Sequence, residues 1–162
     1  MYETVAYATN FRGDEMPFIM KKLNNISRLQ SIFRGESLEV EGLCASHHAF
    51  VFVICRLSGC TQERIAQELC LDKSTVARAL AHLEKHGFIT RLPNEKDKRE
   101  LQVFPTDKML VILSQVKAVS KRWNELICEE ISEQDMEQFL SVLKRIEARA
   151  KTVVEDMRGN EK

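Results

Sequence analysis

The chain has 162 residues, of which 44% are hydrophobic and 30% are charged, and its 24 basic residues balance 24 acidic ones. This composition is typical of a folded globular protein and excludes both a disordered chain and a wholly basic, histone-like protein, although a local basic patch is compatible with it. The length favours one domain, or a small domain with helical extensions.

The N-terminal stretch MYETVAYATNFRGDEMPF does not resemble a signal peptide, because it lacks a basic leader followed by an apolar run. The most apolar run, AFVFVIC at 49–55, is too short to span a bilayer. We therefore expect a cytoplasmic protein that has no membrane partner. The five cysteines are odd in number and include no C-x-x-C pair, which disfavours a disulfide framework and a zinc site, so no metal or cofactor is expected.

Two helices are predicted in the N-terminal part of the chain. The first runs from Pro17 to about residue 35, because apolar residues recur there at helical spacing. Its apolar face consists of Ile19, Leu23, Ile26 and Phe33. Residues 35–42 are predicted to be a connection. The second helix, at about 45–58, is apolar nearly all round and should be buried, with Gly59 at its C-terminal end.

Two short helices joined by a tight bend are predicted next. Thr61 and Asp72 are suitable N-caps for these helices, and Gly87 suits the end of the second one. The inward-facing residues are Ile65, Ala66 and Leu69 in the first helix and Val76, Leu80 and Leu83 in the second. The opposite face of the second helix bears small or polar residues, namely Ser74, Arg78, Ala81, His82 and Lys85.

The pattern changes period after Gly87. The stretches FITRL at 88–92 and ELQVF at 100–104 alternate apolar and polar residues, which predicts two short strands. Between them lies the charged segment PNEKDKR, which begins with the turn formers Pro93 and Asn94. We therefore expect a β-hairpin with a charged tip.

Two longer helices are predicted in the C-terminal part. Thr106 suits the N-cap of a helix that runs to about residue 130, with apolar positions at Met109, Ile112, Val116, Val119, Trp123 and Ile127. Ser132 and Asp135 resemble a capping box for the last helix. That helix carries a heptad-like seam: Met136, Phe139, Leu143, Ile146, Ala150, Val153 and Met157. A seam of this length packs either on another chain or on the first helix of its own chain, and both alternatives stay open.

Two short helices, a bend and a hairpin together form the pattern of a winged helix-turn-helix. The outer face of the second helix suits the major groove of DNA, because Ser74 and Ala81 permit a close approach and Arg78 can donate two hydrogen bonds to a guanine. Ser74, Thr75 and the N-terminus of this helix can meet a phosphate or a base edge.

The hairpin tip is predicted to provide a second contact with DNA. Lys96, Lys98 and Arg99 can reach phosphates or a narrow minor groove, whose negative potential attracts arginine. Asp97 would be repelled by phosphate, so we expect it to hold a neighbouring basic side chain in position.

These residues resemble the MarR family of transcriptional regulators. The resemblance is carried by residues 61–108 and extends more loosely to about 17–157 through the order of the helices. The matching motifs are Thr61-Gln62 with Ile65-Ala66, Ser74-Thr75-Val76, Leu83-Glu84-Lys85-x-Gly87, and Asp97-x-Arg99. The resemblance implies a homodimer whose first and last two helices form the dimerisation body, and which binds an inverted-repeat operator until a small molecule or an oxidant releases it. It also implies that Arg78 is the recognition-helix contact and Arg99 the wing-tip arginine.

The chain departs from the family in three places. The helix after the wing usually opens with Leu-Thr-x-x-Gly, whereas this chain has Pro105-Thr106-Asp107-Lys108-Met109, which leaves the start of that helix open. No cysteine precedes Cys44, so the mechanism of the organic-peroxide sensors is not supported. Residues 106–130 contain no histidine, unlike the corresponding helix of zinc-responsive members.

We therefore predict a mainly α protein with a small β-hairpin wing. Residues 1–42 would contribute a helix to the dimerisation body, residues 43–105 would form the DNA-binding region, and residues 106–162 would form the C-terminal dimerisation helices. The expected activity is sequence-specific DNA binding by a repressor rather than an enzyme, because no nucleophile–base pair or metal set is found. The candidate DNA-binding residues are Thr61, Gln62, Lys73, Ser74, Thr75, Arg78, His82, Lys96, Asp97, Lys98 and Arg99.

Two further sites are hypotheses about regulation. His47, His48 and Trp123 are candidates for a pocket that binds a small aromatic or anionic effector between the first, second and fifth helices. Cys44 is a candidate redox thiol, since it lies at the start of a helix and near His47. The alternatives to a ligand-responsive repressor are therefore a thiol-based redox regulator and a winged-helix module that binds another protein.

Overall fold

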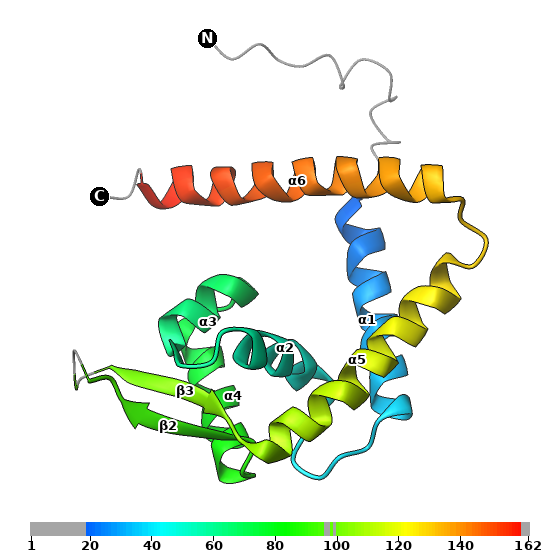
Figure 1. Cartoon of the computed structure of the whole chain (residues 1–162). Helices are drawn as coiled ribbons and strands as arrows, with labels where there is room; N and C mark the ends of the chain where they lie inside the picture. Colours follow the sequence, from blue (N-terminus) through cyan, green and yellow to red (C-terminus); the bar gives the residue numbers. More distant parts are fainter. Residues whose placement is uncertain (1–18, 96–97, 99, 160–162) are drawn as a thin grey trace. The chain divides into compact units, whose positions relative to one another are not determined.

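The computed structural model describes residues 19–95, 98 and 100–159. The chain divides into two compact units, one that ends at Trp123 and one that begins at Asn124. The first unit contains α1 (Ile19–Ser37), the 3-10 helix η1 (Ala45–His47), α2 (His48–Arg56), β1 (Cys60–Thr61), α3 (Gln62–Leu69), α4 (Lys73–Lys85), β2 (Ile89–Pro93), β3 (Leu101–Pro105) and most of α5 (Asp107–Cys128) (Figure 1). The second unit contains α6 (Glu133–Gly159). The prediction of a mainly α protein with a small sheet is confirmed.

The core of the first unit forms around α2. Phe50, Val51 and Ile54 of this helix are buried, as its apolar composition predicted. The predicted inward stripes of α3 and α4 meet them: Ile65, Ala66, Val76, Leu80 and Leu83 are buried in the same cluster. Phe88, Ile89, Val103, Met109, Ile112 and Val116 complete this core. Burial of so many apolar side chains holds the helix-turn-helix rigidly against the sheet and α5.

The sheet has three strands rather than the two that the sequence predicted. Both strands of the hairpin form, one residue later than expected, and β3 lies in the middle in the order β1-β3-β2. The additional strand pairs Cys60 with Val103 and Thr61 with Gln102. A two-residue strand is too short to show an alternating pattern, so its pairing could not be predicted from the sequence. It fixes the start of α3 to the base of the wing.

The predicted helix caps are present. The Thr61 hydroxyl accepts a hydrogen bond from the Arg64 backbone N–H at 3.2 Å, and the Asp72 carboxylate accepts one from the Thr75 N–H at 2.8 Å. Thr106 caps α5 by accepting from the Met109 N–H at 3.4 Å, which places the start of this helix at Asp107 despite the unusual sequence there. Gly87 follows α4 with a φ of 73°, a left-handed conformation that glycine adopts without strain.

Several predicted helix ends shift. The second predicted helix begins as the 3-10 turn η1 and ends at Arg56 rather than residue 58, and α5 ends at Cys128. The first helix continues to Ser37. None of the described helices is long and apolar enough to cross a membrane.

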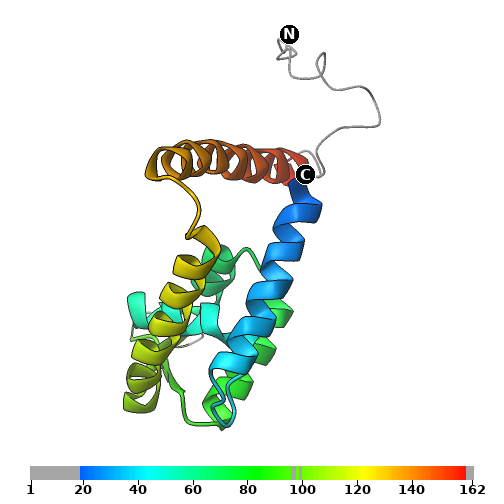
Figure 2. The ribbon, with the colours of Figure 1, turned by 90° about the vertical axis from the view of Figure 1, so that its right-hand side faces the viewer.

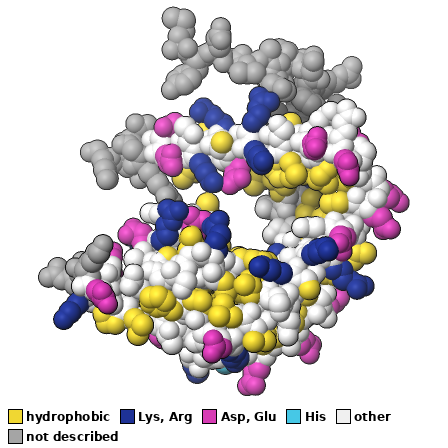
Figure 3. Space-filling view, in the orientation of Figure 1, with side chains coloured by type: hydrophobic (Ala, Val, Ile, Leu, Met, Phe, Trp, Pro, Cys, Tyr) yellow, Lys and Arg dark blue, Asp and Glu magenta, His cyan; other side chains and the backbone are white. Residues whose placement is uncertain are grey.

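Apolar side chains remain exposed on α1 and α6. On α1 no residue is buried, and the exposed apolar residues are Ile19, Met20, Ile26, Leu29 and Ile32. Along α6, Figure 3 shows apolar side chains at the surface; the exposed ones are Phe139, Leu140, Val142, Val153, Val154 and Met157. Within the predicted seam, Met136, Leu143 and Ile146 are half-buried. Apolar surface of this extent is typical of an interface.

Candidate nucleic-acid interface

The exposed face of α4 contains the predicted groove-reading residues. Ser74, Arg78, Ala81 and Lys85 are all exposed, while Val76, Leu80 and Leu83 on the opposite face are completely buried. The helix is therefore fixed by its apolar side and presents a side of small and basic residues. This is the geometry that a helix needs to enter the major groove.

A hydrogen-bond chain at the start of α4 orients Arg78. The Asp72 carboxylate accepts from the Ser74 hydroxyl at 2.5 Å and from the Thr75 hydroxyl at 2.7 Å. The Thr75 oxygen in turn accepts from Nη2 of Arg78 at 3.2 Å. The hydrogen bonds from Ser74 and Thr75 hold the pKa of Asp72 well below its usual range. The carboxylate therefore stays charged and keeps the first turn of the helix ordered.

Three other DNA-binding candidates have structural partners at the contact between α3 and α4. Thr61 caps α3, and the Gln62 side chain donates to the Lys73 backbone carbonyl at 3.2 Å. The Lys73 ammonium lies 2.8 Å from the Glu63 carboxylate, and this ion pair is exposed. These residues fix the angle between the two helices, and an exposed ion pair of this kind can still exchange its partner for a phosphate.

The wing is described only in part. Lys96, Asp97 and Arg99 lie outside the described residues, while Lys98 is exposed. An ion pair joins the wing to α4: Arg91 on β2 donates through Nε to the Glu84 carboxylate at 3.0 Å and also through Nη2. The hydrogen bond from Arg91 lowers the pKa of Glu84 below its ordinary value, and the same bond raises the pKa of Arg91. Arg91 thus positions the wing relative to α4.

Replacement of Arg91 by Met should destabilise the protein in a pH-dependent way. The lowered pKa of Glu84 means that the ion pair stabilises the folded state above the ordinary value of 4.5, and that this contribution is lost as the pH falls below it. The difference in melting temperature between wild type and Arg91→Met should therefore be largest near neutral pH and should shrink at about pH 3. Arg64→Met is the matched control, because it removes the pair between the exposed Arg64 and the half-buried Glu68 while Glu68 keeps Arg56 as a partner. A difference that stays constant down to about pH 3 would contradict this role of the pair.

His82 lies on the exposed side of α4 and contacts other residues of the protein. Its Nε2 lies 3.0 Å from the carbonyl oxygen of Gly42 in the connection between α1 and α2. Its ring stacks on His47 with centroids 4.9 Å apart and on His86 with centroids 4.4 Å apart. The connection, in cyan, lies beside the C-terminal part of α4, in green, in both ribbon views (Figures 1 and 2). The sequence analysis did not identify Gly42 as a partner of His82, because the two residues are forty positions apart in the chain.

The three effector-pocket candidates do not converge on one point. His47 faces α4, whereas His48 is almost completely buried and is close enough to Arg34 of α1 for that guanidinium to affect its charge. Trp123 of α5 packs on Phe33 of α1, with ring centroids 5.3 Å apart. Phe33 and Arg34 are neighbours, so His48 and Trp123 both lie along the same stretch of α1. Within the described residues, the buried polar atoms that have no hydrogen-bond partner are Arg34 Nε, His48 Nδ1 and Ser120 Oγ.

Cys44 is exposed at the N-cap of η1. Its Sγ lies 3.3 Å from Nδ1 of His47 and 3.0 Å from the Ser46 hydroxyl. The predicted proximity of Cys44 and His47 is therefore confirmed. By contrast, burial raises the pKa values of Cys55 and Cys60, which disfavours their reactive thiolate forms.

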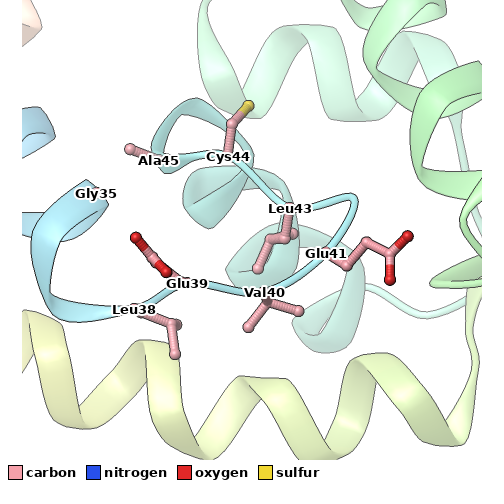
Figure 4. Close-up of a pocket in the computed structure, with 8 residues that line it drawn as sticks. All are labelled: Gly35, Leu38, Glu39, Val40, Glu41, Leu43, Cys44 and Ala45. Atoms are coloured by element: carbon pink, nitrogen blue, oxygen red, sulfur yellow. The ribbon is translucent and has the colours of Figure 1, made fainter.

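Cys44 also lines an open pocket of about 580 Å³ along the α1–α2 connection (Figure 4). The remaining lining residues are Gly35, Leu38, Glu39, Val40, Glu41, Leu43 and Ala45. Among the described residues, no group of three or more His, Cys, Asp or Glu side chains is arranged to hold a metal ion.

Comparison with known proteins identifies the same region. The model of the MarR family matches residues 45–101, which span η1 to the start of β3. The HTH-type transcriptional regulator YybA of Bacillus subtilis, itself uncharacterised, is 27% identical over 129 residues, which cover 79% of this chain and 85% of the relative.

Solved structures extend the similarity beyond the winged helix. A MarR transcriptional regulator from Methanosarcina mazei is 28% identical with a TM-score of 0.76, and the match covers 85% of this chain and 99% of that one. A protein of Listeria monocytogenes, assigned to the MarR family and complexed with 26mer DNA, shares the fold with a TM-score of 0.77 at 22% identity, over 83% of this chain and 89% of that one. The winged helix, the order of the surrounding helices and these similarities together show that the chain is similar to the MarR family of transcriptional regulators.

Proposed function

We propose that this protein is a DNA-binding transcriptional regulator that reads its operator with α4. The observation that carries this proposal is the exposed face of α4, where Arg78 is held by Thr75 between the small residues Ser74 and Ala81. A guanidinium at the centre of a narrow helix face can donate to O6 and N7 of a guanine. The Listeria monocytogenes protein of the same fold was solved with DNA, which supports this use of the fold. Its relatives are regulators, and we propose no enzymatic activity.

The wing would supply the second contact with DNA. Lys98 is exposed next to Arg99, and the basic residues of the tip would neutralise phosphates. The Arg91–Glu84 pair would hold this tip at a constant distance from α4, so that both elements engage one face of the duplex. A chromosomal target of this kind implies that the protein acts in the cytoplasm.

We further propose that the protein acts as a homodimer on an inverted repeat. The exposed apolar residues of α1 and α6 include Ile26, Leu29, Phe139 and Val153, and a second copy would cover them. A two-fold dimer presents two copies of α4 to half-sites that are about one helical turn, or about 34 Å, apart. Residues 1–42 and 106–162, which flank the DNA-binding region 43–105 in the sequence, would then form the dimerisation body.

We propose that the effector is a small apolar anion. Binding of this anion would cause the protein to dissociate from its operator, so the protein would act as a repressor. Arg34, His48 and Ser120 each carry a buried polar atom without a partner, on α1, α2 and α5 respectively. Arg34 could pair with a carboxylate, while Phe33 and Trp123 supply aromatic surface nearby. Because α2 belongs to the DNA-binding core, a ligand at this junction could change the spacing of the two α4 helices.

The salt dependence of duplex binding tests the proposed function. A DNA-binding protein that neutralises several phosphates loses about 10³–10⁵ in affinity between about 50 and 200 mM salt. The purified protein should show a steep loss of this kind with genomic duplexes, measured by fluorescence anisotropy. Absence of duplex binding at low salt would favour the alternative of a winged-helix module that binds another protein.

Thiol regulation is a second candidate, favoured by the contact between Cys44 and His47. The Cys44 sulfur would attack the O–O bond of a hydroperoxide, giving a cysteine sulfenic acid and an alcohol, and the thiol proton would pass to the leaving oxygen through the His47 imidazole. The sulfenic acid would then disturb the connection next to α4.

Cys44→Ser should therefore bind the operator like wild type and resist release by peroxide. Release is measured by anisotropy before and after treatment with cumene hydroperoxide, with Cys70→Ser as the control, because Cys70 is also exposed. If peroxide releases wild type and Cys44→Ser from the operator equally, or releases neither of them, the small-molecule effector remains as the mode of regulation.

A further inference from the structure

Three of the four histidines of the chain meet where the α1–α2 connection contacts α4. His47 comes from η1, His82 from the exposed side of α4, and His86 from its C-terminal cap. Consecutive rings lie 4.9 Å and 4.4 Å apart in the order His47, His82, His86. We call these three residues the histidine stack.

The histidine stack attaches the connection to the recognition helix. His82 Nε2 lies 3.0 Å from the Gly42 carbonyl oxygen, so a ring with a proton on Nε2 donates to it. Gly42 has a φ of 78°, and a Cβ at this position would lie only 2.4 Å from the His86 ring. The Gly42 backbone is therefore in direct contact with both α4 histidines. A change in the position or charge of these rings therefore affects both the α1–α2 connection and the C-terminal half of α4.

The groups around the stack are mostly cationic or neutral. The Cys44 thiol contacts His47, and Glu41 precedes Gly42 on the connection. From α1, Arg34 acts on the adjacent His48, and from α5 the Lys108 ammonium donates to the His86 carbonyl at 2.9 Å. In the described part of the chain, none of the three rings forms an ion pair with a carboxylate.

Protonation of this arrangement is unfavourable. His47 is only 8% exposed, the His82 ring lies next to it and the His86 ring lies beyond His82, so a charge on the His47 ring is both poorly solvated and repelled once a neighbour is charged. Burial lowers the pKa of His47 below its ordinary value of 6.5, and His82 and His86 lower it further. A histidine whose folded pKa is lowered contributes stability above the unfolded value, and this contribution is lost as the pH falls below it.

We propose that the histidine stack makes DNA binding sensitive to mildly acidic pH, because protonation of the His47 ring loosens the contact between the α1–α2 connection and α4. The proposal rests on the proposed function, since it concerns the affinity of α4 for its operator. With a neutral His47, the stack would hold α4 in the position in which it reads DNA. With a charged His47, the α1–α2 connection at Gly42 would lose its contact with α4.

The direction of the pH effect distinguishes this proposal from simple electrostatics. A histidine that touched only phosphate would bind DNA more tightly when protonated, because the added positive charge attracts the backbone. The stack predicts the opposite, namely weaker binding at acidic pH. His82 was a DNA-contact candidate from its position on α4, so the two interpretations of this residue make opposite predictions.

The test uses the full-length protein and a duplex recovered from genomic DNA by binding to it. Affinity is measured by anisotropy at about pH 7.5 and about pH 5.5 at constant ionic strength, a range that spans the ordinary histidine pKa. Wild type should lose several-fold in affinity, up to about tenfold per protomer, over this range, because each protomer must release a proton from His47 before it binds DNA. His47→Phe preserves an aromatic ring at the stack and cannot be protonated, so it should bind like wild type at the higher pH and lose less than about threefold at the lower one.

His47→Gln is the second uncharged variant, and thermal melts at both pH values check that each variant is folded. Unchanged or tighter binding of wild type at the lower pH, or equal losses in wild type and both variants, would overturn the proposal. Failure of both folded variants to bind at the higher pH would also overturn it, because the ring would then be needed for packing rather than for its protonation. Absence of specific binding by wild type at the higher pH would instead overturn the proposed function itself.

Discussion

Arg78→Ala should weaken operator binding by about 1–3 kcal/mol per half-site and should remove the preference for one base pair in each half-site. The Arg78 guanidinium is exposed at the centre of α4, and Thr75 holds it through Nη2 at 3.2 Å. Because this orientation exists before DNA is bound, little side-chain entropy is lost on binding. In a dimer two half-sites are affected, so the total loss should be about 2–6 kcal/mol, which is about 30-fold to 10⁴-fold in affinity.

The measurement is the affinity of wild type and variant for the operator and for a series of single-base-pair changes. Arg64→Ala is the matched control, because Arg64 is an exposed arginine on α3 whose guanidinium pairs with Glu68. The control should retain the base preference. If Arg78→Ala retains both the affinity and the base preference, α4 does not read DNA through Arg78, and the proposed orientation of α4 on DNA is wrong.

Leu143→Asp should convert the protein to a monomer and abolish tight operator binding. Leu143 lies in the middle of the seam on α6 and is half-buried in the single chain. An aspartate there would place an unpaired charge in the apolar interface, which costs several kcal/mol. Loss of the dimer also separates the two copies of α4, so each half-site would be bound with only the affinity of one protomer.

Sedimentation analysis at micromolar concentration measures the mass, and anisotropy measures binding. Ser141→Asp is the matched control, since Ser141 is exposed on α6 and lies outside the seam. The control should remain dimeric. A wild type that sediments as a monomer, or a Leu143→Asp variant that remains a dimer, would contradict the proposed interface.

The sequence predicted the parts of the fold that depend on local periodicity and capping. The stripe of Val76, Leu80 and Leu83 specified α4 because a helix buries every third or fourth residue. Asp72 specified where this helix starts, since its side chain can satisfy a free backbone N–H. The strand β1 was missed because two residues show no period, and its partner Val103 is distant in the chain.

The contacts of the site could be predicted only in part. The exposed face of α4 followed from its periodicity, but the contact of His82 with Gly42 did not, because the two residues are forty positions apart and only the fold brings them together. The proximity of Cys44 to His47 was predictable, since it follows from one turn of helix. Whether a side chain such as Gln62 faces DNA or a neighbouring helix depends on the angle between α3 and α4, which no local pattern specifies.

The central claim is that the protein recognises a particular duplex sequence with two copies of α4. The most direct measurement is selection of genomic fragments by the purified protein, followed by competition between the selected duplex and a scrambled duplex of the same composition. We predict an inverted repeat with half-site centres about 34 Å apart, bound by two protomers and favoured over the scrambled duplex by about 10³-fold or more. No enrichment of any fragment, or equal affinity for the selected and scrambled duplexes, would contradict the claim.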